Sequence, residues 1–350
     1  MKHKRIITLL LVLAMLLGVL PVTAAAEITE DAAAAQSTAT TIDVTDYGAD
    51  PSGKTDSVRA VQKALEAAKE VEGAVVLSFP KGEYHFWPDY ATKRDLYISN
   101  ATHKGYDKNY ARTIGILLEG QKDLTLEGNG SQFLFHGKMM SFAVIDSKNV
   151  TIRNLSYDFV RPAAIDMTVV KVAHNTAEIY LPDCYEYEIE NSNELVFYGE
   201  KSYVTGERYW TLNKTTYQYA QVIDLTTGAM WRDGWLASGW ILFGNCTRIE
   251  KIENDPQRLL LTYSQAPQVK AGYSVQVKEL MRDNPTMLLW QSEGVTLQDI
   301  NIQYMHSFGI VGQFSKDITV DHVTVAANDR KGTVTAASAD MMQMSGCGGQ

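Results

Sequence analysis

The sequence has few of the residues that mark a disulfide scaffold or a metal centre. Its three cysteines, Cys184, Cys246 and Cys347, are odd in number and far apart, so they predict no disulfide framework and fit no zinc-ligand spacing. The seven histidines never approach ligand spacing, and there is no phosphate-binding glycine loop, His-Glu-x-x-His motif or serine-nucleophile signature. We therefore expect neither a metal nor an organic cofactor.

Clustered positive charge is also scarce. The chain has 32 Lys and Arg against 41 Asp and Glu, a formal net charge of −9, and its only basic cluster is Lys2–Arg5. Because binding to a phosphate backbone needs clustered Lys and Arg, this balance argues against nucleic acid as a partner. Neutral or cationic ligands remain open, and nothing in the sequence indicates an oligomeric state.

The N-terminus has the pattern of an export signal. Lys2–Arg5 leads into an apolar run from Ile6 to about Leu20, and Ala24–Ala26 offers an Ala-x-Ala cleavage site. We predict a signal peptide over 1–26, a flexible lead-in over 27–41, and a secreted protein with no membrane segment after cleavage. An N-terminal anchor is the alternative, although a spanning helix needs about 20 apolar residues.

Apolar strands return at a regular spacing along the chain. KDLTLEG at 122–128 recurs 26 residues later as KNVTIRN, and EGVTLQDINIQ at 293–303 recurs 23 residues later as KDITVDHVTVA. Such a repeat is typical of a parallel β solenoid, in which each rung buries its apolar residues only when neighbours stack on it. Coincidental similarity between strands is the alternative. The sequence thus predicts an all-β protein built as a parallel β-helix.

Two regions differ from this repeat. After a short strand and a Gly/Pro/Ser turn, an amphipathic helix is expected to begin at Thr55 or Asp56, to stop at Gly73, and to cap the stack. A later region alternates aromatic and β-branched strands with short polar turns, which predicts an inserted antiparallel β domain. The predicted order is the cap and first rungs over 42–169, the inserted domain over 170–277, and further rungs over 278–350.

Carboxylates on the solenoid are the candidate catalytic groups. Side chains one rung apart stand about 5 Å from each other, so two carboxyl groups can bracket a glycosidic bond. A separation of about 6.5–9.5 Å gives inversion, and about 5–5.5 Å gives retention. Asp340 is the strongest candidate, with a solvated turn residue as the alternative. Asp299, Asp317 and Asp321 sit at or beside turns and are better explained as structural.

The place of Asp340 follows from an alignment of the last rungs. Matching SGCGGQ with QFSKDI aligns Cys347 with Ser315, an offset of 32 residues. This offset implies about nine extra residues between Ala326 and Ser338. Asp340 would therefore lie one rung after FGIVGQ, beside a local protrusion.

Several aromatic and basic residues could contact a sugar. Trp87, Tyr90 and Tyr97 have the apolar body and polar rim that stack on a pyranose ring, and Arg94 could donate hydrogen bonds to hydroxyl groups. Packing within the core is the alternative for the aromatic residues.

Two polar residues flank the rung before Asp340. His306 and Gln313 lie on either side of SFGIVG, where they could hydrogen-bond a substrate, with solvated turn positions as the alternative. The predicted substrate-binding set is Trp87, Arg94, His306 and Gln313.

Longer stretches resemble known proteins. VTDYGADPSGKTDSVRAVQKAL and LSFPKGEYHF resemble the N-terminal cap and first rung of the pectate-lyase-like right-handed β-helix superfamily. ATKRDLYISN, GIVGQFSKDITVD and ADMMQMSGC, with the region from Ile116 to Pro162, are similar to glycoside hydrolase family 110. That family comprises secreted bacterial exo-α-1,3-galactosidases, which release terminal galactose from Galα1,3Gal and blood-group-B-like glycans with inversion. The resemblance extends from Ile42 to Cys347 and implies such an enzyme.

The resemblance also assigns roles to carboxylates. Asp340 matches the aspartate of the family's Ala-Asp-x-x-x-x-Ser-Gly-Cys motif, which implies a general acid. The family's Asp-Asp pair, where the general base is expected, should come one rung later, beyond Gln350. We therefore expect an incomplete chain that is inactive as it stands. The alternatives are a polyuronate lyase or hydrolase on the same β-helix, and a non-catalytic carbohydrate-binding protein.

Overall fold

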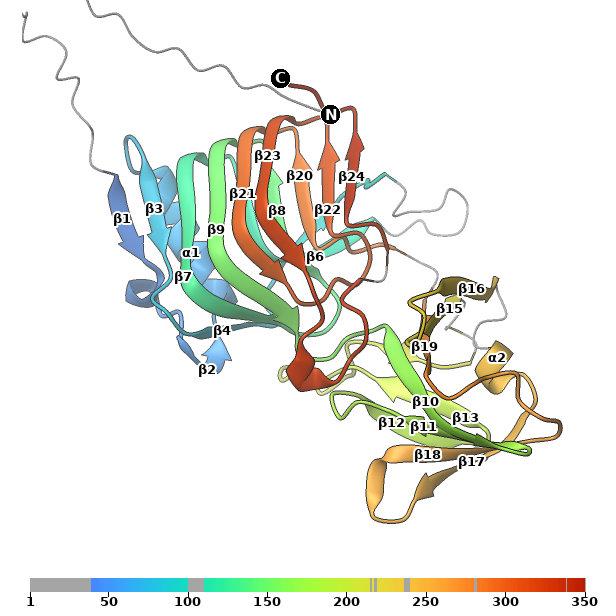
Figure 1. Cartoon of the computed structure of the whole chain (residues 1–350). Coiled ribbons are helices and arrows are strands. Elements are labelled where there is room, and N and C mark those ends of the chain that lie inside the picture. The colour runs from blue at the N-terminus through green and yellow to red at the C-terminus, as the bar shows by residue number, and fades with distance from the viewer. Residues whose placement is uncertain are drawn as a thin grey trace, which may run out of the picture. The chain divides into compact units, whose positions relative to one another are not determined.

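The computed structural model describes residues 39–99, 110–214, 216, 219–235, 240–279, 282–337 and 339–349 (Figure 1). The predicted signal peptide and all but the end of the predicted lead-in lie outside these residues. Strands dominate the described chain, and the first of them begins at Thr40. None of the helices in the described ranges is both long enough and apolar enough to cross a bilayer.

Two mainly parallel sheets form the stack. The first has the order β1-β3-β7-β9-β21-β23, with β4 also paired to β7 and β2 paired to β4, and Figure 1 shows its long strands side by side. Its strands are β1 (Thr40–Asp43), β2 (Ser52–Asp56), β3 (Val75–Ser78), β4 (Glu83–Phe86), β7 (Lys122–Phe135), β9 (Lys148–Phe159), β21 (Glu293–Ile302) and β23 (Lys316–Val325). The second has the order β24-β22-β20-β8-β6-β5, in which β5 alone pairs antiparallel. Its strands are β5 (Thr92–Asp95), β6 (Ala111–Glu119), β8 (Met140–Ile145), β20 (Met287–Trp290), β22 (Ile310–Gln313) and β24 (Met342–Ser345).

The chain between β9 and β20 forms antiparallel sheets with a core of their own. The larger sheet contains β10 (Ile165–Ala173), β11 (Thr176–Tyr180), β15 (Tyr219–Asp224), β16 (Met230–Trp235), β17 (Cys246–Ile252), β18 (Asp255–Tyr263) and β19 (Tyr273–Lys278). The smaller contains β12 (Glu186–Glu190), β13 (Glu194–Tyr198) and β14 (Thr211–Leu212). Short helices complete the description: η2 (Val44–Tyr47), α2 (Trp240–Phe243) and η3 (Asp329–Lys331).

The strand pairing confirms the repeat predicted from the sequence. Leu126 pairs with Ile152, which pairs with Leu297, which pairs with Val320. Leu126, Ile152 and Leu297 are fully buried and form one apolar column inside the stack. Because β9 and β21 are direct neighbours, the chain leaves the stack after β9 and returns to it more than a hundred residues later.

A line of left-handed residues bends each long strand. Asn154, Asp299 and His322 occupy matching positions with φ of 56°, 51° and 49°. A second line, which includes Asp123 and Asp317, marks the strand starts. Asn and Asp tolerate this conformation better than most residues because their short polar side chains bond locally. Asp299 and Asp317 are therefore bend residues, as expected.

A ladder of hydroxyl groups holds the turns between the two sheets. The amide of Ser147 donates to Ser292 Oγ at 3.1 Å, and the amide of Ser292 donates to Ser315 Oγ at 3.0 Å. Cys347 takes the next position, since Gln313 pairs with Ser345 and Lys316 with Gly348. The predicted offset of 32 residues is thus confirmed, and a thiol stands where the other rungs have a hydroxyl.

Helix α1 (Val58–Lys69) buries the apolar face expected of it, including Val61 and Leu65. Its N-cap is Ser57, one residue later than predicted, although the Asp56 carboxylate still accepts a bond from the Val58 amide at 3.0 Å. The helix ends at Lys69, before the left-handed Gly73. The Asp56 side chain thus makes the capping hydrogen bond, although Ser57 occupies the N-cap position.

The buried column makes stability depend on single side chains. Leu297→Ala leaves a cavity between Ile152 and Val320, so we expect the free energy of unfolding to fall by about 2–5 kcal/mol in denaturant titration. Thr296→Ala, on the opposite face of β21, serves as the control and should cost under about 1 kcal/mol. Equal losses in the two variants would contradict this packing.

Candidate functional site

The connections that follow the long strands carry two of the candidate residues, His306 and Asp340. Since β7, β9, β21 and β23 are parallel, their C-terminal ends meet at one edge, and the segments that leave them are neighbours. Asp340 lies in the connection from β23 to β24, has an exposed side chain, and accepts a hydrogen bond from the Gly309 amide through its carbonyl at 3.1 Å. Its carboxylate is therefore accessible on a backbone that is fixed by the preceding rung.

The connection that precedes Asp340 is held by a buried ion pair. Asp158, at the end of β9, is 1% exposed and lies 2.6 Å from Lys331 Nζ. The same ammonium group donates to the Phe159 carbonyl, and Asn328 donates to Asp158 at 3.3 Å. A buried carboxylate is costly unless it is paired, so this contact fixes the start of the connection.

A second buried carboxylate holds the middle of the connection. Asp166, at the start of β10, accepts hydrogen bonds from the amides of Val334 and Thr335, each at 2.9 Å. Burial raises the pKa of Asp166, and these hydrogen bonds oppose the rise. Asp158 and Asp166 together tie the extra residues of this rung to the end of β9 and the start of β10, so the chain that leads to Asp340 is held in place.

A buried lysine lies close enough to Asp340 to sense its charge. Lys278 ends β19, is 9% exposed, and has its Nζ 4.7 Å from the ring centroid of Tyr219. Burial and the charges of Arg282 and Arg232 lower the pKa of Lys278 to about 7, while the charge of Asp340 acts in the opposite direction. The positive charge that Asp340 experiences from this lysine therefore changes near neutral pH.

Lys138 and Glu279 form the next polar contact. Their side chains lie 2.5 Å apart and are 18% and 32% exposed. Burial would lower the pKa of Lys138, but the carboxylates of Glu279 and Asp283 outweigh it, so the pKa is raised. The Glu279 side of this pair lies at the C-terminal end of β19, directly after Lys278 in the chain.

His306 belongs to the same set of connections. Its Nε2 lies 3.1 Å from the Gly137 carbonyl, and its ring packs on Phe159 with centroids 3.9 Å apart. Burial, followed by the charge of Lys138, lowers the pKa of His306 to about 3. The ring is therefore neutral at physiological pH, with Nε2 protonated because a carbonyl can only accept.

The other predicted sugar contacts are engaged elsewhere. Gln313 is buried, donates to the Tyr97 carbonyl at 3.1 Å and accepts from the Ser99 amide at 2.6 Å, so it anchors a segment that crosses the outer face of β22. Arg94 pairs with Glu119 at 2.9 Å. These contacts give both residues structural partners and do not join them to Asp340.

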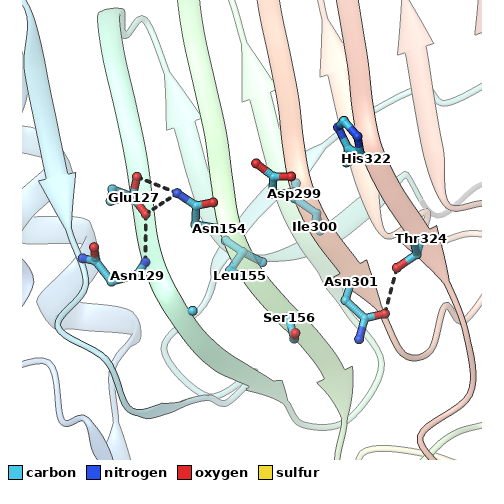
Figure 2. Close-up of a pocket in the computed structure, with 11 residues that line it drawn as sticks. Glu127, Asn129, Asn154, Leu155, Ser156, Asp299, Ile300, Asn301, His322 and Thr324 are labelled. Atoms are coloured by element: carbon cyan, nitrogen blue, oxygen red, sulfur yellow. Dashed lines mark hydrogen bonds between the residues drawn. The ribbon is translucent and has the colours of Figure 1, made fainter.

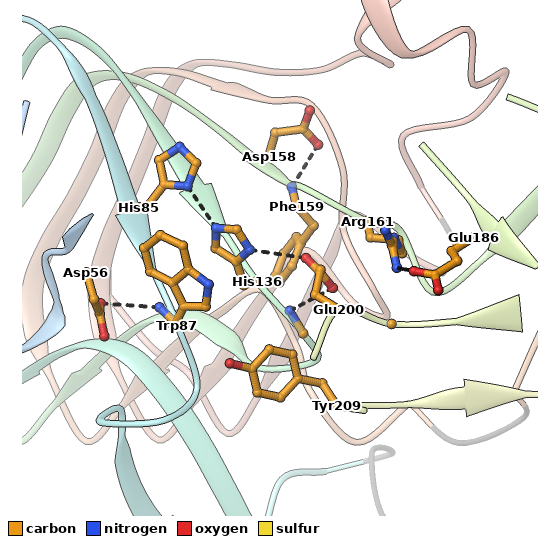
Figure 3. Close-up of polar contacts among 12 residues, drawn as sticks. Asp56, His85, Trp87, His136, Asp158, Phe159, Arg161, Glu186, Glu200 and Tyr209 are labelled. Carbon is orange, nitrogen blue, oxygen red and sulfur yellow. Dashed lines mark hydrogen bonds and ion pairs between the residues drawn. The ribbon is translucent and has the colours of Figure 1, made fainter. Parts of the chain in front are cut away.

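Trp87 lies in a network of histidines and carboxylates (Figure 3). Its ring stacks on His136 at 4.0 Å, and His136 Nε2 lies 2.8 Å from His85 Nδ1. His136 Nδ1 lies 3.2 Å from Glu200, which comes from the antiparallel region. One face of Trp87 is thus covered by protein. Of the other aromatics, Tyr90 packs under Arg59, while Tyr97 is 55% exposed.

A shallow polar groove follows the line of strand bends (Figure 2). It has a volume of about 520 Å³, and Glu127, Asn154, Asp299 and His322 line it. Glu127 is held by Arg153 at 2.7 Å and by Asn154 at 2.9 Å. These residues shape the bend, and the groove is separate in the fold from the connections around Asp340.

Sequence patterns did not identify Lys138, Lys278 or Glu279 as part of a site. Lys138 and Glu279 are 141 residues apart, and neither belongs to a motif. The sequence offers one indication of these residues: each lies next to the end of a strand that the repeat or the strand pattern predicts.

Comparison with known proteins gives a family and named relatives. The family model described as Rhamnogalacturonase A/epimerase, pectate lyase-like matches residues 41–248. An α-1,3-galactosidase A of Peterkaempfera griseoplana is 40% identical over 320 residues, covering 89% of this chain and 42% of that protein. An α-1,3-galactosidase A of Streptomyces avermitilis is 36% identical, covering 91% and 50%.

These relatives confirm the resemblance to α-1,3-galactosidases. The chain spans about half the length of the curated relatives that it matches. A solved family 28 exopolygalacturonase of Yersinia enterocolitica is 12% identical, covers 82% of this chain and 38% of that one, and aligns with a TM-score of 0.27. That score is too low to define a fold, so the fold rests on the strand pairing and the family match.

Lys278 makes stability depend on pH. In the folded protein it loses its proton near pH 7, whereas in the unfolded chain it keeps it up to its ordinary 10.5. Between these values the unfolded state binds more protons, so this group makes the wild type more stable as pH rises. Lys278→Met removes the effect. Relative to the wild type, the variant should therefore gain most below pH 7 and progressively less towards pH 10.

Denaturant titrations across this pH range measure the difference in free energy of unfolding. The exposed Lys270, which precedes β19, supplies the control for loss of one positive charge, as Lys270→Met. A constant difference between Lys278→Met and the wild type at all pH values would contradict a buried lysine that titrates near neutrality.

Proposed function

The chain belongs to the rhamnogalacturonase A/epimerase, pectate lyase-like family, and from that premise we propose that the protein is a glycoside hydrolase that removes terminal α-1,3-linked galactose. The observation that carries the proposal is the match to α-1,3-galactosidases over nine-tenths of the chain. This match favours hydrolysis of galactosides over the alternatives of polyuronate cleavage and carbohydrate binding alone.

Asp340 acts as the general acid in this proposal. Its protonated carboxyl donates the proton to the glycosidic oxygen as the bond from that oxygen to galactose C1 breaks. A water molecule attacks C1 from the opposite face, and a second carboxylate, about 6.5–9.5 Å away, takes its proton. The α-galactoside then yields β-galactose.

The substrate class and the location are part of the same proposal. Terminal galactose of Galα1,3Gal and blood-group-B-like glycans is uncharged, which suits a site where Lys138 and Glu279 neutralise each other at 2.5 Å. The basic start, apolar run and Ala-x-Ala sequence support secretion. Extracellular glycans would then be directly accessible to the enzyme.

The finer architecture also belongs to this proposal. We take the stack as a right-handed β-helix, capped by α1, with the antiparallel sheets from Ile165 to Lys278 as an inserted domain. The buried face of α1 supports the cap, because the helix packs on the interior residues of the first rungs. The direct pairing of β9 with β21 and the separate core of the antiparallel strands support the insertion.

The role of Asp340 is testable by one substitution in the full-length protein. Asp340→Asn keeps the shape but cannot donate the proton, so kcat on Galα1,3Gal should fall by about 10²–10⁴-fold. Asp321→Asn, an exposed aspartate on β23, is the matched control and should keep wild-type turnover. Retention of full activity in Asp340→Asn, with an unchanged melting temperature, would remove Asp340 from the mechanism.

The stereochemistry is a separate test. A single displacement by water gives β-galactose as the first product, and mutarotation follows more slowly. We expect the β anomeric proton to appear first when hydrolysis is followed by NMR from the time of mixing. Initial appearance of the α anomer would indicate a covalent intermediate and a carboxylate nucleophile.

A further inference from the structure

The connection that enters β20 brings an arginine to the edge of the second sheet where Asp340 lies. Strands β20, β22 and β24 are parallel neighbours, which Figure 1 shows side by side, so the segments that enter them meet at one edge. Arg282 lies just before β20, and Asp340 lies just before β24. The two residues therefore stand on the same side of the sheet, with the entry to β22 between them.

Phe308, in the entry to β22, lies beside Asp340. The offset of 32 residues that relates β22 to β24 also holds at the bridge from Met305 to Ala337. This register places Phe308 opposite Asp340 on the neighbouring rung, at a backbone spacing of about 5 Å. The hydrogen bond from the Gly309 amide to the Asp340 carbonyl, at 3.1 Å, agrees with it.

The guanidinium group of Arg282 stacks on Phe308. Its Cζ lies 4.8 Å from the ring centroid. Phe308 is 1% exposed and belongs to an apolar cluster that includes Leu288 of β20, and Ala339, which directly precedes Asp340, packs against the same cluster. The ring is therefore a fixed support. Stacking uses the flat face of the guanidinium group and leaves the N–H groups at its edge available to a ligand.

The N–H groups of Arg282 are accessible. Its side chain is exposed, and it forms no ion pair with any carboxylate that the structure describes. Arg94, in contrast, is paired with Glu119 at 2.9 Å. A guanidinium group carries five N–H donors and no acceptor, so one that is not engaged by a carboxylate can donate to the hydroxyl oxygens of a bound molecule.

The buried Lys278 gives independent support for the proximity of Arg282 and Asp340. Burial, followed by the charge of Arg282, lowers the pKa of Lys278 to about 7, and the charge of Asp340 opposes this shift. One ammonium group thus responds to both side chains. This agrees with the register and the stacking, which place the two residues at one edge of the sheet.

Asp340 and Arg282 offer complementary groups to a galactoside. The general acid stands at the glycosidic oxygen, so the galactose ring that carries this oxygen lies against the edge. A pyranose ring is about as wide as the spacing between rungs, so a sugar bound at Asp340 extends to the neighbouring rung, where Arg282 is stacked. Because arginine keeps its charge at every physiological pH, its hydrogen bonds to sugar hydroxyls do not depend on a titration.

We propose that Arg282 is a substrate-binding residue, whose guanidinium group donates hydrogen bonds to hydroxyl groups of the terminal galactose. The inference rests on the proposed galactosidase function, because it takes Asp340 as the acid. It assigns a direct contact with the sugar to the connection between β19 and β20, for which no sequence motif gave an indication.

The test measures galactose binding and turnover in the full-length protein. Arg282→Ala should weaken the binding of free galactose about tenfold in calorimetry, as for loss of a hydrogen bond from a charged group. KM for Galα1,3Gal and for p-nitrophenyl α-galactoside should rise by a similar factor, with a smaller change in kcat. Arg282→Lys should recover part of the loss, because an ammonium group keeps the charge but not the planar set of donors.

Arg59→Ala is the matched control. Arg59 is also exposed and stacks on an aromatic ring, that of Tyr90 at 3.3 Å, but it lies on α1, which packs on the first rungs. Its loss should change neither galactose binding nor KM. Because both arginines are exposed, both variants should keep the melting temperature of the wild type.

Equal galactose binding by Arg282→Ala and the wild type would overturn the inference even if the enzyme is active. An unchanged KM, with only the pH profile of kcat displaced, would also overturn it, because Arg282 would then act on the charge of Asp340 and not on the sugar. Galactose binding that depends on Arg282, in a protein that hydrolyses neither substrate, would sustain the contact and refute the proposed function.

Discussion

Stacking of identical rung positions is the constraint on which the rest of the structure depends. An apolar column such as Leu126, Ile152 and Leu297 is buried only because each member lies above or below another. Left-handed residues at matching positions bend every long strand at the same place. As a result, the connections that leave these strands emerge at one edge, whatever their length or sequence.

Buried polar groups then hold the connections at this edge in fixed positions. The connection before Asp340 is held by Asp158 and Asp166, two carboxylates that would be costly to bury without partners. Both come from the chain just before and after it leaves the stack. The same contacts therefore fix both the point where the chain leaves the stack and the connection that leads to Asp340.

The repeat, the strand register and the apolar face of α1 could be predicted from the sequence because each is a local periodic pattern. The offset that pairs Gln313 with Ser345 could be predicted from the same periodic pattern. The loop that this offset implies shows no periodic pattern in its own sequence. Of the candidate residues at this edge, the sequence indicated only Asp340 and His306, because they lie beside recognisable rungs. Gln313 was expected to meet substrate, but its amide satisfies the backbone of a segment more than two hundred residues away. Local sequence patterns do not predict such long-range pairings, of which Lys138 with Glu279 is another.

The charges around Asp340 follow a consistent physical logic if it is the acid. A nearby cation stabilises the carboxylate that remains after proton transfer, but it also resists protonation before transfer. Lys278 limits this conflict because burial against Tyr219 lowers its pKa to about 7, so near neutrality its charge is only partly present. An arginine at this position would keep its charge at every physiological pH.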